Sequence, residues 1–174
     1  TLFIECDMRR PSLRLSADAP DAAGLSEVLA GRVTFEACVS EPSNSSLSVL
    51  SSGAVPPNPL EMLSSRKFSA LLRVLASKYE MIVLDTAPVA VVSDAVVVAS
   101  HATSVVFVVK ADDTPYRLAQ RSISRVLESG TPVVGIVMNQ MDFRKAQTYH
   151  GEYSAVGGER YYGSYGRASV GRHV

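Results

Sequence analysis

The strongest indication of the fold is Met81-Ile82-Val83-Leu84-Asp85-Thr86-Ala87-Pro88, a segment that continues to Ser93 and Asp94. Its first four residues are apolar without alternation, which predicts a strand covered on both faces inside a parallel sheet. Asp85 ends the apolar run, and Pro88 keeps the strand from continuing. A carboxylate at the carboxyl end of such a strand lies where open α/β sheets bind ligands, unless Asp85 only caps the following turn or helix.

Composition predicts a soluble globular domain. The chain has 174 residues, of which 47% are hydrophobic, enough for one domain with its own core. With 17 basic and 17 acidic residues the formal net charge is zero, so no overall field favours nucleic acid or an anionic membrane. Cys6 and Cys38 have no metal-ligand spacing, and we expect both to be small core residues. No apolar run approaches the roughly 20 residues that cross a bilayer. A start at Thr1, inside an apolar run, predicts a fragment whose earlier part is missing.

Apolar periodicity predicts alternating strands and helices along the chain. Other strands are predicted at residues 2–4, 47–50, 105–109 and 133–138. Helices are predicted at residues 24–31, 34–39, 65–77 and 115–129. Prolines predict a rigid, non-helical connector at residues 56–59. The whole pattern predicts an α/β fold with a mostly parallel sheet, flanked by helices and joined by right-handed crossovers.

Polar residues recur where the predicted strands end, at Asp7, Asp85, Asp112 and Asn139. Parallel strands would bring these positions to one edge of the sheet. The first strand is also followed by Arg9 and Arg10, and Glu5 precedes Asp7. Acids with arginines suit a site for metal and phosphate, although a solvated turn with weak surface ion pairs is the alternative.

The pattern changes after residue 142, where we predict a flexible tail over residues 143–174. Five of the seven tyrosines lie in it: Tyr149, Tyr153, Tyr161, Tyr162 and Tyr165. Aromatic and glycine-rich tails can stack on RNA, and accessible tyrosines can also accept phosphate. The sequence alone leaves both roles open for the tail.

Several separated stretches carry a family resemblance. They are Phe-Ile-Glu-Cys-Asp-Met-Arg-Arg-Pro (3–11), Gly-Leu-Ser-Glu-Val-Leu-Ala-Gly (24–31), Pro-Pro-Asn-Pro-Leu-Glu-Met-Leu (56–63), Ile-Val-Leu-Asp-Thr-Ala-Pro (82–88), Ser-Asp-Ala (93–95) and Gly-Ile-Val-Met-Asn (135–139). In this order, and with the tyrosine cluster behind them, they resemble the cytoplasmic domain of the bacterial tyrosine autokinases of capsule and exopolysaccharide synthesis. The resemblance covers about residues 2–140.

The resemblance implies a deviant P-loop ATPase fold, like that of the partition and septum-positioning ATPases, with ATP and Mg²⁺ as cofactors. Glu5 and Asp7 would belong to the acidic motif Walker A′, which Arg9 ends, and Asp85 to Walker B. These three acids are the expected catalytic residues, and Asp7 and Asp85 would hold the metal. Arg9 and Asn139, the latter near the adenine, would bind the nucleotide. The tail tyrosines would be the autophosphorylation sites.

The chain departs from the family pattern at two places. Glu5 stands where the family usually has Asp, and one more methylene displaces the carboxylate by roughly an ångström. No Gly-x-x-x-x-Gly-Lys-Ser/Thr loop occurs anywhere in the chain. We therefore expect residues 1–142 to be a partial P-loop kinase domain that is inactive alone, with the loop, the ring-forming helix and the transmembrane segments upstream of Thr1.

The expected function is ATP-dependent protein-tyrosine autokinase activity that regulates polysaccharide polymerisation and export. The expected partners are further subunits in a ring, phosphorylating tails in trans, a membrane activator domain, the polysaccharide machinery and a tyrosine phosphatase, with no nucleic acid. The expected location is the cytoplasmic face of the bacterial inner membrane. The alternatives are a switch ATPase of the partition type and a non-catalytic regulatory module.

Overall fold

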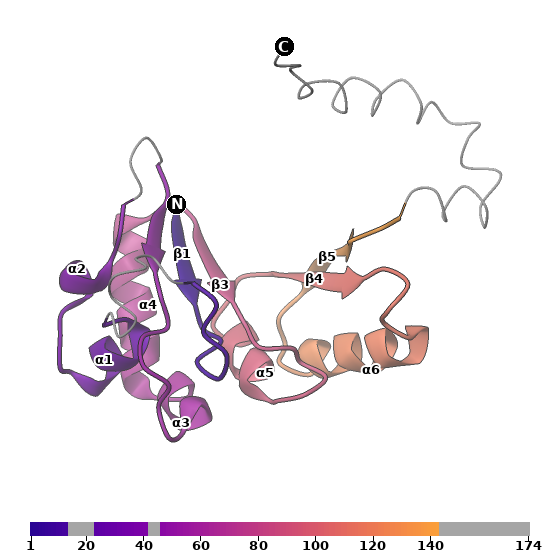
Figure 1. Ribbon diagram of the computed structural model, residues 1–174, viewed down its shortest axis with the longest axis horizontal. Coiled ribbons are helices and arrows are strands. Elements are labelled where there is room, and N and C mark those ends of the chain that lie inside the picture. Colours follow the sequence, from indigo (N-terminus) through magenta and orange to yellow (C-terminus); the bar gives the residue numbers. More distant parts are fainter. Residues whose placement is uncertain (14–22, 42–45, 143–174) are drawn as a thin grey trace, which may run out of the picture. The chain divides into compact units, whose positions relative to one another are not determined.

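The computed structural model describes residues 1–13, 23–41 and 46–142 as an α/β fold (Figure 1). The strands are β1 (Leu2–Glu5), β2 (Ser48–Leu50), β3 (Ile82–Asp85), β4 (Val105–Lys110) and β5 (Val133–Asn139). The helices are α1 (Leu25–Ala30), α2 (Phe35–Cys38), α3 (Pro59–Leu63), α4 (Arg66–Lys78), α5 (Asp94–Ala99) and α6 (Tyr116–Leu127). The predicted tail, with its five tyrosines, lies outside the described residues.

Contacts between residues divide the chain into two compact units. The first comprises Thr1–Phe107 and Pro115–Ile136, and it contains β1 to β3 and all six helices. The second comprises Val108–Thr114 and the described residues from Val137 onward. We describe each unit by itself. None of the helices in the described part of the chain has both the length and the apolar character needed to cross a membrane.

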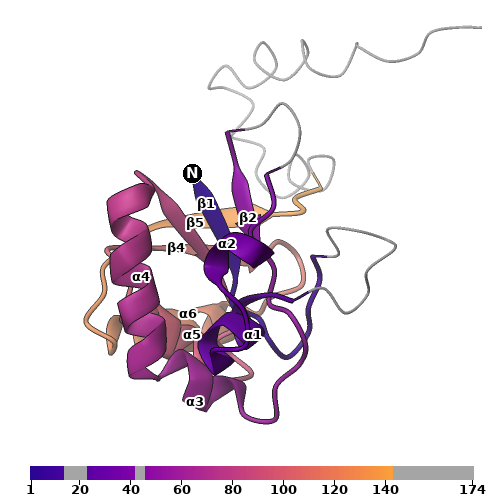
Figure 2. The ribbon, with the colours of Figure 1, turned by 90° about the vertical axis from the view of Figure 1, so that its left-hand side faces the viewer.

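The three strands of the first unit form a parallel sheet in the order β2-β1-β3 (Figure 2). The register on one side runs from Leu2 opposite Ile82 to Glu5 opposite Asp85. The predicted parallel pairing of these strands is confirmed. Because β1 and β3 run in the same direction and in register, both deliver an acid to the same edge of the sheet.

The main core lies between this sheet and helices that cover it. Leu2 and Ile4 of β1 are fully buried, and they pack in one cluster with Phe68 and Leu75 of α4. Helix α4 begins at the predicted point, because the hydroxyl of Ser65 accepts a hydrogen bond from the Phe68 amide at 3.2 Å. The apolar stripe of this helix, which the sequence predicts at residues 65–77, is therefore part of the core.

The prediction that β3 is covered on both faces is wrong for the described residues. Ile82 and Leu84 are half-buried, but Met81 is 57% and Val83 42% exposed. The reason is that the described segments pack on one face only of this strand. An apolar run without alternation shows that both faces of a strand can be buried, and it does not show that other segments pack on both.

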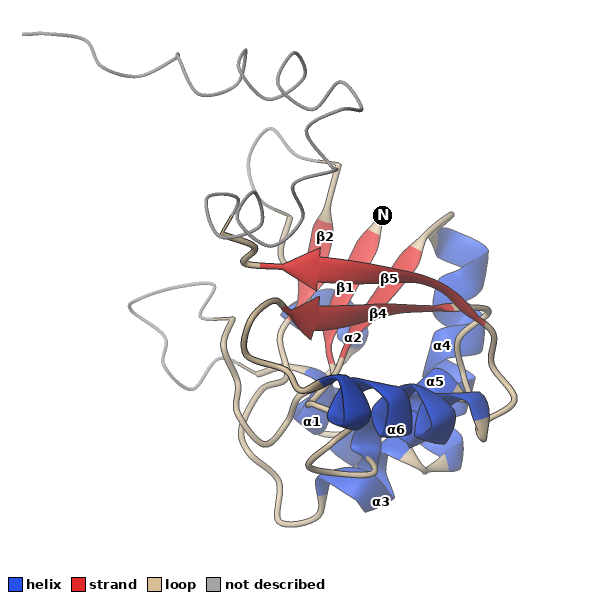
Figure 3. Ribbon diagram, turned by 90° about the vertical axis from the view of Figure 1, so that its right-hand side faces the viewer, coloured by secondary structure: helices blue, strands red, loops and turns tan. Residues whose placement is uncertain are grey.

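Strands β4 and β5 form a second, two-stranded sheet and run in the same direction (Figure 3). Within the first unit, Val126 of α6 packs with Val105, Phe107 and Val133 in a second, smaller apolar cluster. Apolar side chains of these strands are exposed, namely Val106, Val134 and Ile136 in the first unit and Val108 and Met138 in the second.

Three details of the helices differ from the sequence-based predictions. Pro59 is the first residue of α3 and does not belong to a non-helical connector, because its missing N–H would have no partner at that position anyway. Helix α5, an unbroken apolar run between Asp94 and Ala99, had no predicted counterpart. Residues 60–63 continue α3, although no helix is predicted there from the sequence.

Candidate active site at the ends of β1 and β3

The candidate site lies where β1 and β3 end. Glu5 and Asp85 are partners in the strand register, and the amide of Cys6 donates to the main-chain carbonyl of Asp85 at 2.8 Å. This last hydrogen bond extends the pairing by one residue and holds the beginning of the β1 loop, with Asp7, against the end of β3. The structure thus brings together three predicted site residues, Glu5, Asp7 and Asp85.

Glu5 is fully buried, and donors occupy both oxygens of its carboxylate. Its Oε1 accepts from the amide and hydroxyl of Ser12 at 2.6 and 2.9 Å and from the amide of Leu13 at 2.9 Å. Its Oε2 accepts from the amide and hydroxyl of Ser52 at 3.1 and 3.0 Å. Glu5 therefore ties the loop after β1 to the loop after β2.

The surroundings of Glu5 favour its charged form. Burial by itself would raise the pKa of the carboxyl, but the hydrogen bonds from Ser12, Leu13 and Ser52 outweigh it, so the pKa lies below its ordinary value. A carboxylate with a lowered pKa and fully occupied oxygens is poorly suited to accept a proton or bind a metal. For Glu5 these contacts favour a structural role over the predicted catalytic one.

Asp7 shapes the loop that leaves β1. Its Oδ1 accepts from the amides of Arg9 and Arg10, both at 3.1 Å. Such contacts from an aspartate to the amides two and three residues ahead fix the turn locally. Because Oδ1 accepts both of these bonds, Oδ2 is the oxygen that remains for other partners.

Asp85 has the opposite electrostatic character to Glu5. Desolvation raises the pKa of its carboxyl, and the negative charges of Glu5 and Asp7 raise it further, against a smaller opposing effect of the Thr86 amide. Burial, together with the negative charges of Asp85 and Glu5, also raises the pKa of the Cys6 thiol. The edge of the sheet therefore carries a concentration of negative charge that the nearby hydrogen bonds do not fully offset.

Arg9 is bound to a residue that the sequence analysis did not place in the site. Its Nε donates to Oδ2 of Asp94 at 2.7 Å, and its Nη2 donates to Oδ1 of the same carboxylate at 3.0 Å. Asp94 is 2% exposed and opens α5. An aspartate directly before an unbroken apolar run was the available signal, because a buried charge at the start of a helix needs a partner.

Ser52 is the second site residue that sequence reasoning missed. The turn Ser51-Ser52-Gly53 packs against the start of α1, where the amides of Leu25 and Ser26 donate to the carbonyls of Ser51 and Ser52 at 2.8 and 3.0 Å. A methyl group on Gly24 would collide with the main chain of Ser51 and Gly53. This packing holds the amide and hydroxyl of Ser52 in place as donors to Glu5.

The loop after β3 is anchored from α6. Nη1 of Arg125 donates to the carbonyl of Val89 at 2.8 Å, and Nη2 lies 3.5 Å from the hydroxyl of Ser93. Because this loop runs from Asp85 to Asp94, Arg125 helps to determine the position of both ends of the site.

Asn139 and Asp112, two other predicted strand-end residues, belong to the second unit. The main-chain carbonyl of Asn139 accepts from the amide of Ala111 at 2.9 Å, and its side chain accepts from the amide of Gln140 at 2.9 Å. Asp112 has a left-handed backbone, with φ of 59°. Their place relative to Asp85 stays a prediction.

No ready-made metal centre accompanies these acids. Across residues 1–13, 23–41 and 46–142, no three His, Cys, Asp or Glu side chains gather in a group that could hold an ion. Mg²⁺ needs fewer protein ligands than that, because substrate phosphates and water complete its shell. The two cysteines, as predicted, are buried and free.

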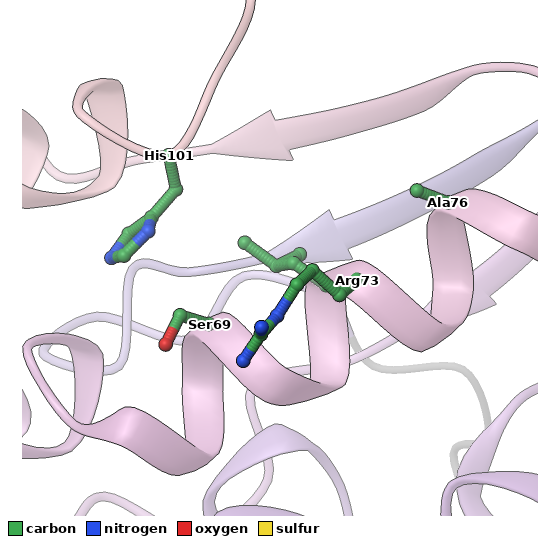
Figure 4. Close-up of a pocket in the computed structure, with 5 residues that line it drawn as sticks. Ser69, Arg73, Ala76 and His101 are labelled. Atoms are coloured by element: carbon green, nitrogen blue, oxygen red, sulfur yellow. The ribbon is translucent and has the colours of Figure 1, made fainter.

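A groove beside α4 is chemically different from this site (Figure 4). It is lined by Ser69, Leu72, Arg73, Ala76 and His101. The ring of His101 meets that of Phe68 edge-on, with centroids 5.3 Å apart. The groove has no carboxylate in its lining, so it lacks the groups that distinguish the edge of the sheet.

Comparisons with known proteins point in one direction. No protein-family model matches the chain. The chain is 33% identical over 153 residues to the putative tyrosine-protein kinase CapB of Staphylococcus aureus, a match covering 88% of this chain and 67% of CapB. It is 32% identical over 148 residues to the tyrosine-protein kinase Wzc of Salmonella typhimurium, covering 85% of this chain but 20% of Wzc.

Solved structures agree with these relatives. The kinase domain of VpsO superposes with a TM-score of 0.76 at 33% identity, over 81% of this chain and 70% of that one. The cell division ATPase MinD of Pyrococcus furiosus gives a TM-score of 0.61 at 19% identity, over 81% of this chain and 61% of MinD, a likeness of fold alone. The P-loop ATPase fold predicted from the sequence is thereby confirmed.

Proposed function

Because the chain belongs to the bacterial tyrosine-protein kinases, we propose that it carries the acidic half of the active site of an ATP-dependent protein-tyrosine autokinase. The reaction transfers the γ-phosphoryl group of ATP to a tyrosine hydroxyl. The chain spans 67% of CapB and 20% of Wzc, so the activity proposed is that of the polypeptide to which these residues belong.

The observation that carries the proposal is the concentration of carboxylates at the ends of β1 and β3. Asp7 and Asp85 lie close enough for the charge of Asp7 to raise the pKa of Asp85. Glu5 adds to this charge, but its own oxygens are saturated by hydrogen bonds. Asp7 and Asp85 are therefore the two acids whose charge calls for a further cation.

These residues fit Mg²⁺ with ATP. Phosphoryl transfer depends mostly on positioning and on neutralising charge, and Mg²⁺ bound with ATP supplies that neutralisation. Asp7 and Asp85 would hold the ion, which accepts one or two carboxylates beside phosphate and water ligands. Either acid can also accept the proton of the attacking phenol, and the raised pKa of Asp85 suits it to that role.

Nucleotide contacts and phosphate acceptors complete the proposal. Asn139 would contact the adenine, as its place in the family motif implies. Arg9 would contact phosphate through the face of its guanidinium that Asp94 does not occupy. The acceptors would be Tyr149, Tyr153, Tyr161, Tyr162 and Tyr165.

The wider setting is also part of the proposal. Wzc and CapB are similar enough in sequence to support a role beside the capsule or exopolysaccharide machinery. The protein would act at the cytoplasmic face of the inner membrane, with a membrane activator domain and with further subunits in a ring. A tyrosine phosphatase would reverse the modification.

The test is phosphopeptide mass spectrometry after incubation with Mg-ATP, using the polypeptide expressed from its natural initiation codon. We expect phosphotyrosine in the segment 149–165, and its loss in Asp85→Ala. Asp113→Ala is the matched control, because Asp113 is an exposed aspartate that forms a surface ion pair with Lys110. ATP turnover without phosphotyrosine would support the switch ATPase, and neither product nor turnover would support a regulatory module.

A further inference from the structure

The ion pair between Arg9 and Asp94 joins two segments that are 85 residues apart. Both contacts are short, at 2.7 and 3.0 Å, and the guanidinium meets the carboxylate through two of its donors. Such two-pronged pairs are stronger and more specific in direction than contacts through one donor. Asp94 follows Asp85 on the chain, and Arg9 follows Asp7, so the pair bridges the segments that carry the two acids.

The burial of Asp94 makes this pair different from a surface ion pair. The side chain of Asp94 is 2% exposed, whereas that of Arg9 is 40% exposed. A buried carboxylate without a partner is costly, and the guanidinium is the cation within contact. Arg9 is therefore drawn from the surface into a position determined by a residue on α5.

Arg9 transmits this constraint to Asp7 through its main chain. The amide of Arg9 donates to Oδ1 of Asp7 at 3.1 Å, and the amide of Arg10 does the same. Fixing the side chain of Arg9 on Asp94 thus restricts the peptide groups that hold the carboxylate of Asp7. Asp94 is connected to Asp7 by a continuous chain of contacts.

The pair also controls where the charge of Arg9 lies. A guanidinium released from Asp94 would still belong to the residue whose amide contacts Asp7, and its charge would compete with a metal ion for that carboxylate. With Asp94 present, the positive charge of Arg9 is matched by a carboxylate outside the cluster. The carboxylates at the edge of the sheet therefore remain available to a metal ion.

We propose that Asp94 is a positioning residue of the phosphoryl-transfer site, which holds the loop of Asp7 through Arg9 and keeps the charge of Arg9 out of the divalent-cation site. This inference rests on the proposed function for its metal-binding part. Its anchoring part concerns the free chain and does not depend on any activity.

The anchoring part is tested by amide hydrogen exchange on the metal-free chain. We expect Asp94→Asn to accelerate exchange at Arg9 and Arg10, whose amides contact Asp7, while the core helix α4 exchanges as before. Glu36→Gln is the control, because it removes the charge of an exposed ion pair with Lys78. Unchanged exchange at Arg9 and Arg10 in Asp94→Asn would overturn the anchoring.

The charge part is tested by titration with Mn²⁺, a paramagnetic substitute for Mg²⁺, followed by electron paramagnetic resonance. Release of a unit charge beside a partly exposed site should weaken Mn²⁺ binding roughly fivefold in Asp94→Asn. Adding Arg9→Gln removes that charge, so the double variant should recover most of the affinity although its loop stays loose. A merely structural role for Asp94 predicts no recovery.

The outcomes separate this inference from the proposed function. Weak Mn²⁺ binding in both the single and the double variant, or equal binding in the parent and Asp94→Asn, would overturn the charge part. Failure of the parent to bind Mn²⁺ would contradict the metal site itself, and with it the charge part, while the exchange data still decide the anchoring. Absence of phosphotyrosine would count against the proposed function alone.

Discussion

Glu5 and Asp85 lie opposite each other on two parallel strands, and their surroundings shift the pKa values of their carboxyl groups in opposite directions. Both are affected by burial, which alone raises the pKa of each. Hydrogen bonds reverse this effect for Glu5, whereas neighbouring negative charges reinforce it for Asp85. Two acids in equivalent strand positions thus have opposite electrostatic surroundings.

The first prediction concerns the stability provided by Glu5. Glu5→Gln keeps the volume of the side chain but turns part of a saturated acceptor into a donor that faces the donors of Ser12 and Ser52. We expect the free energy of unfolding to fall by about 2–4 kcal/mol, because several hydrogen bonds to a buried charge are lost. Urea unfolding measures this, and Glu36→Gln, at an exposed site, should change little. Equal effects of the two variants would contradict the anchoring role.

The second prediction concerns the pH dependence of Asp85. Because its pKa in the folded chain is raised above 3.8, ionisation of Asp85 destabilises the fold. That cost is absent below pH 3.8 and fully present once the pH exceeds the folded pKa. Asp85→Asn should therefore raise the urea midpoint at pH 7, and the gain should disappear on acidification to below pH 3.8. A gain that is the same at both pH values would show that charge is not its cause.

The third prediction applies the same reasoning to Glu5 with the opposite sign. Its folded pKa lies below 4.5, so the charged form stabilises the fold above pH 4.5, and this contribution is lost as the pH falls through the folded pKa. The difference in stability between the parent and Glu5→Gln should therefore be largest at neutral pH and shrink in acid. Urea unfolding at a series of pH values gives the comparison. A difference that grew in acid would be inconsistent with the lowered pKa.

The fourth prediction concerns the packing of Gly24 on the turn that carries Ser52. A methyl group on Gly24 would overlap the amide nitrogen of Gly53 and the carbonyl of Ser51, and main-chain atoms cannot move aside cheaply. Gly24→Ala should cost about 1–3 kcal/mol of stability, as overpacking does. Gly135→Ala is the matched control, because nothing lies within 4 Å of the added carbon there. Thermal unfolding distinguishes the two, and a silent Gly24→Ala would refute the close approach.

The fifth prediction concerns Arg125 and the loop after β3. Arg125→Met removes the donor to the carbonyl of Val89 but keeps an apolar stem on α6. Amide exchange at Val91 and Val92, which bond to Pro88 inside this loop, should accelerate roughly tenfold, since a hydrogen bond from a charged group is lost. Arg121→Met, at an exposed position of the same helix, should leave the loop unchanged. Similar exchange in both variants would exclude Arg125 as the anchor.

Local pattern was a sound guide to the elements and to the fold class. The stripe of α4, the capping hydroxyl of Ser65 and the apolar runs of β1 and β3 are local features, and they recur in the structure. The placement of Asp7 and Asp85 at one edge also followed from the chain, because parallel strands in a common direction leave no other arrangement. The stretches that resemble the tyrosine autokinases led us to expect kinase chemistry, and the relatives found by sequence comparison are named tyrosine-protein kinases.

The hydrogen-bond and ion-pair partners of the charged side chains could not be predicted from local sequence patterns. Asp94 and Arg9 are 85 positions apart, and the residues next to each of them do not indicate that the two form an ion pair. Ser52 had the appearance of an ordinary turn residue, and its role as a donor to Glu5 exists only because β2 pairs with β1. The exposure of Met81 and Val83 likewise depends on which segments pack on β3, which its apolar run does not specify.

The sequence by itself determined the strands, most of the helices and which acids end the strands, because periodicity and capping act over a few neighbouring residues. Only the tertiary structure decided which acid is saturated, which carries an unbalanced charge and which one holds the arginine. Burial and hydrogen bonding come from contacts between distant segments, and a pKa follows those contacts and not the residue type. Glu5, Asp85 and Asp94 are all carboxylates in the sequence, but in the fold hydrogen bonds saturate Glu5, negative charges surround Asp85, and Asp94 binds Arg9.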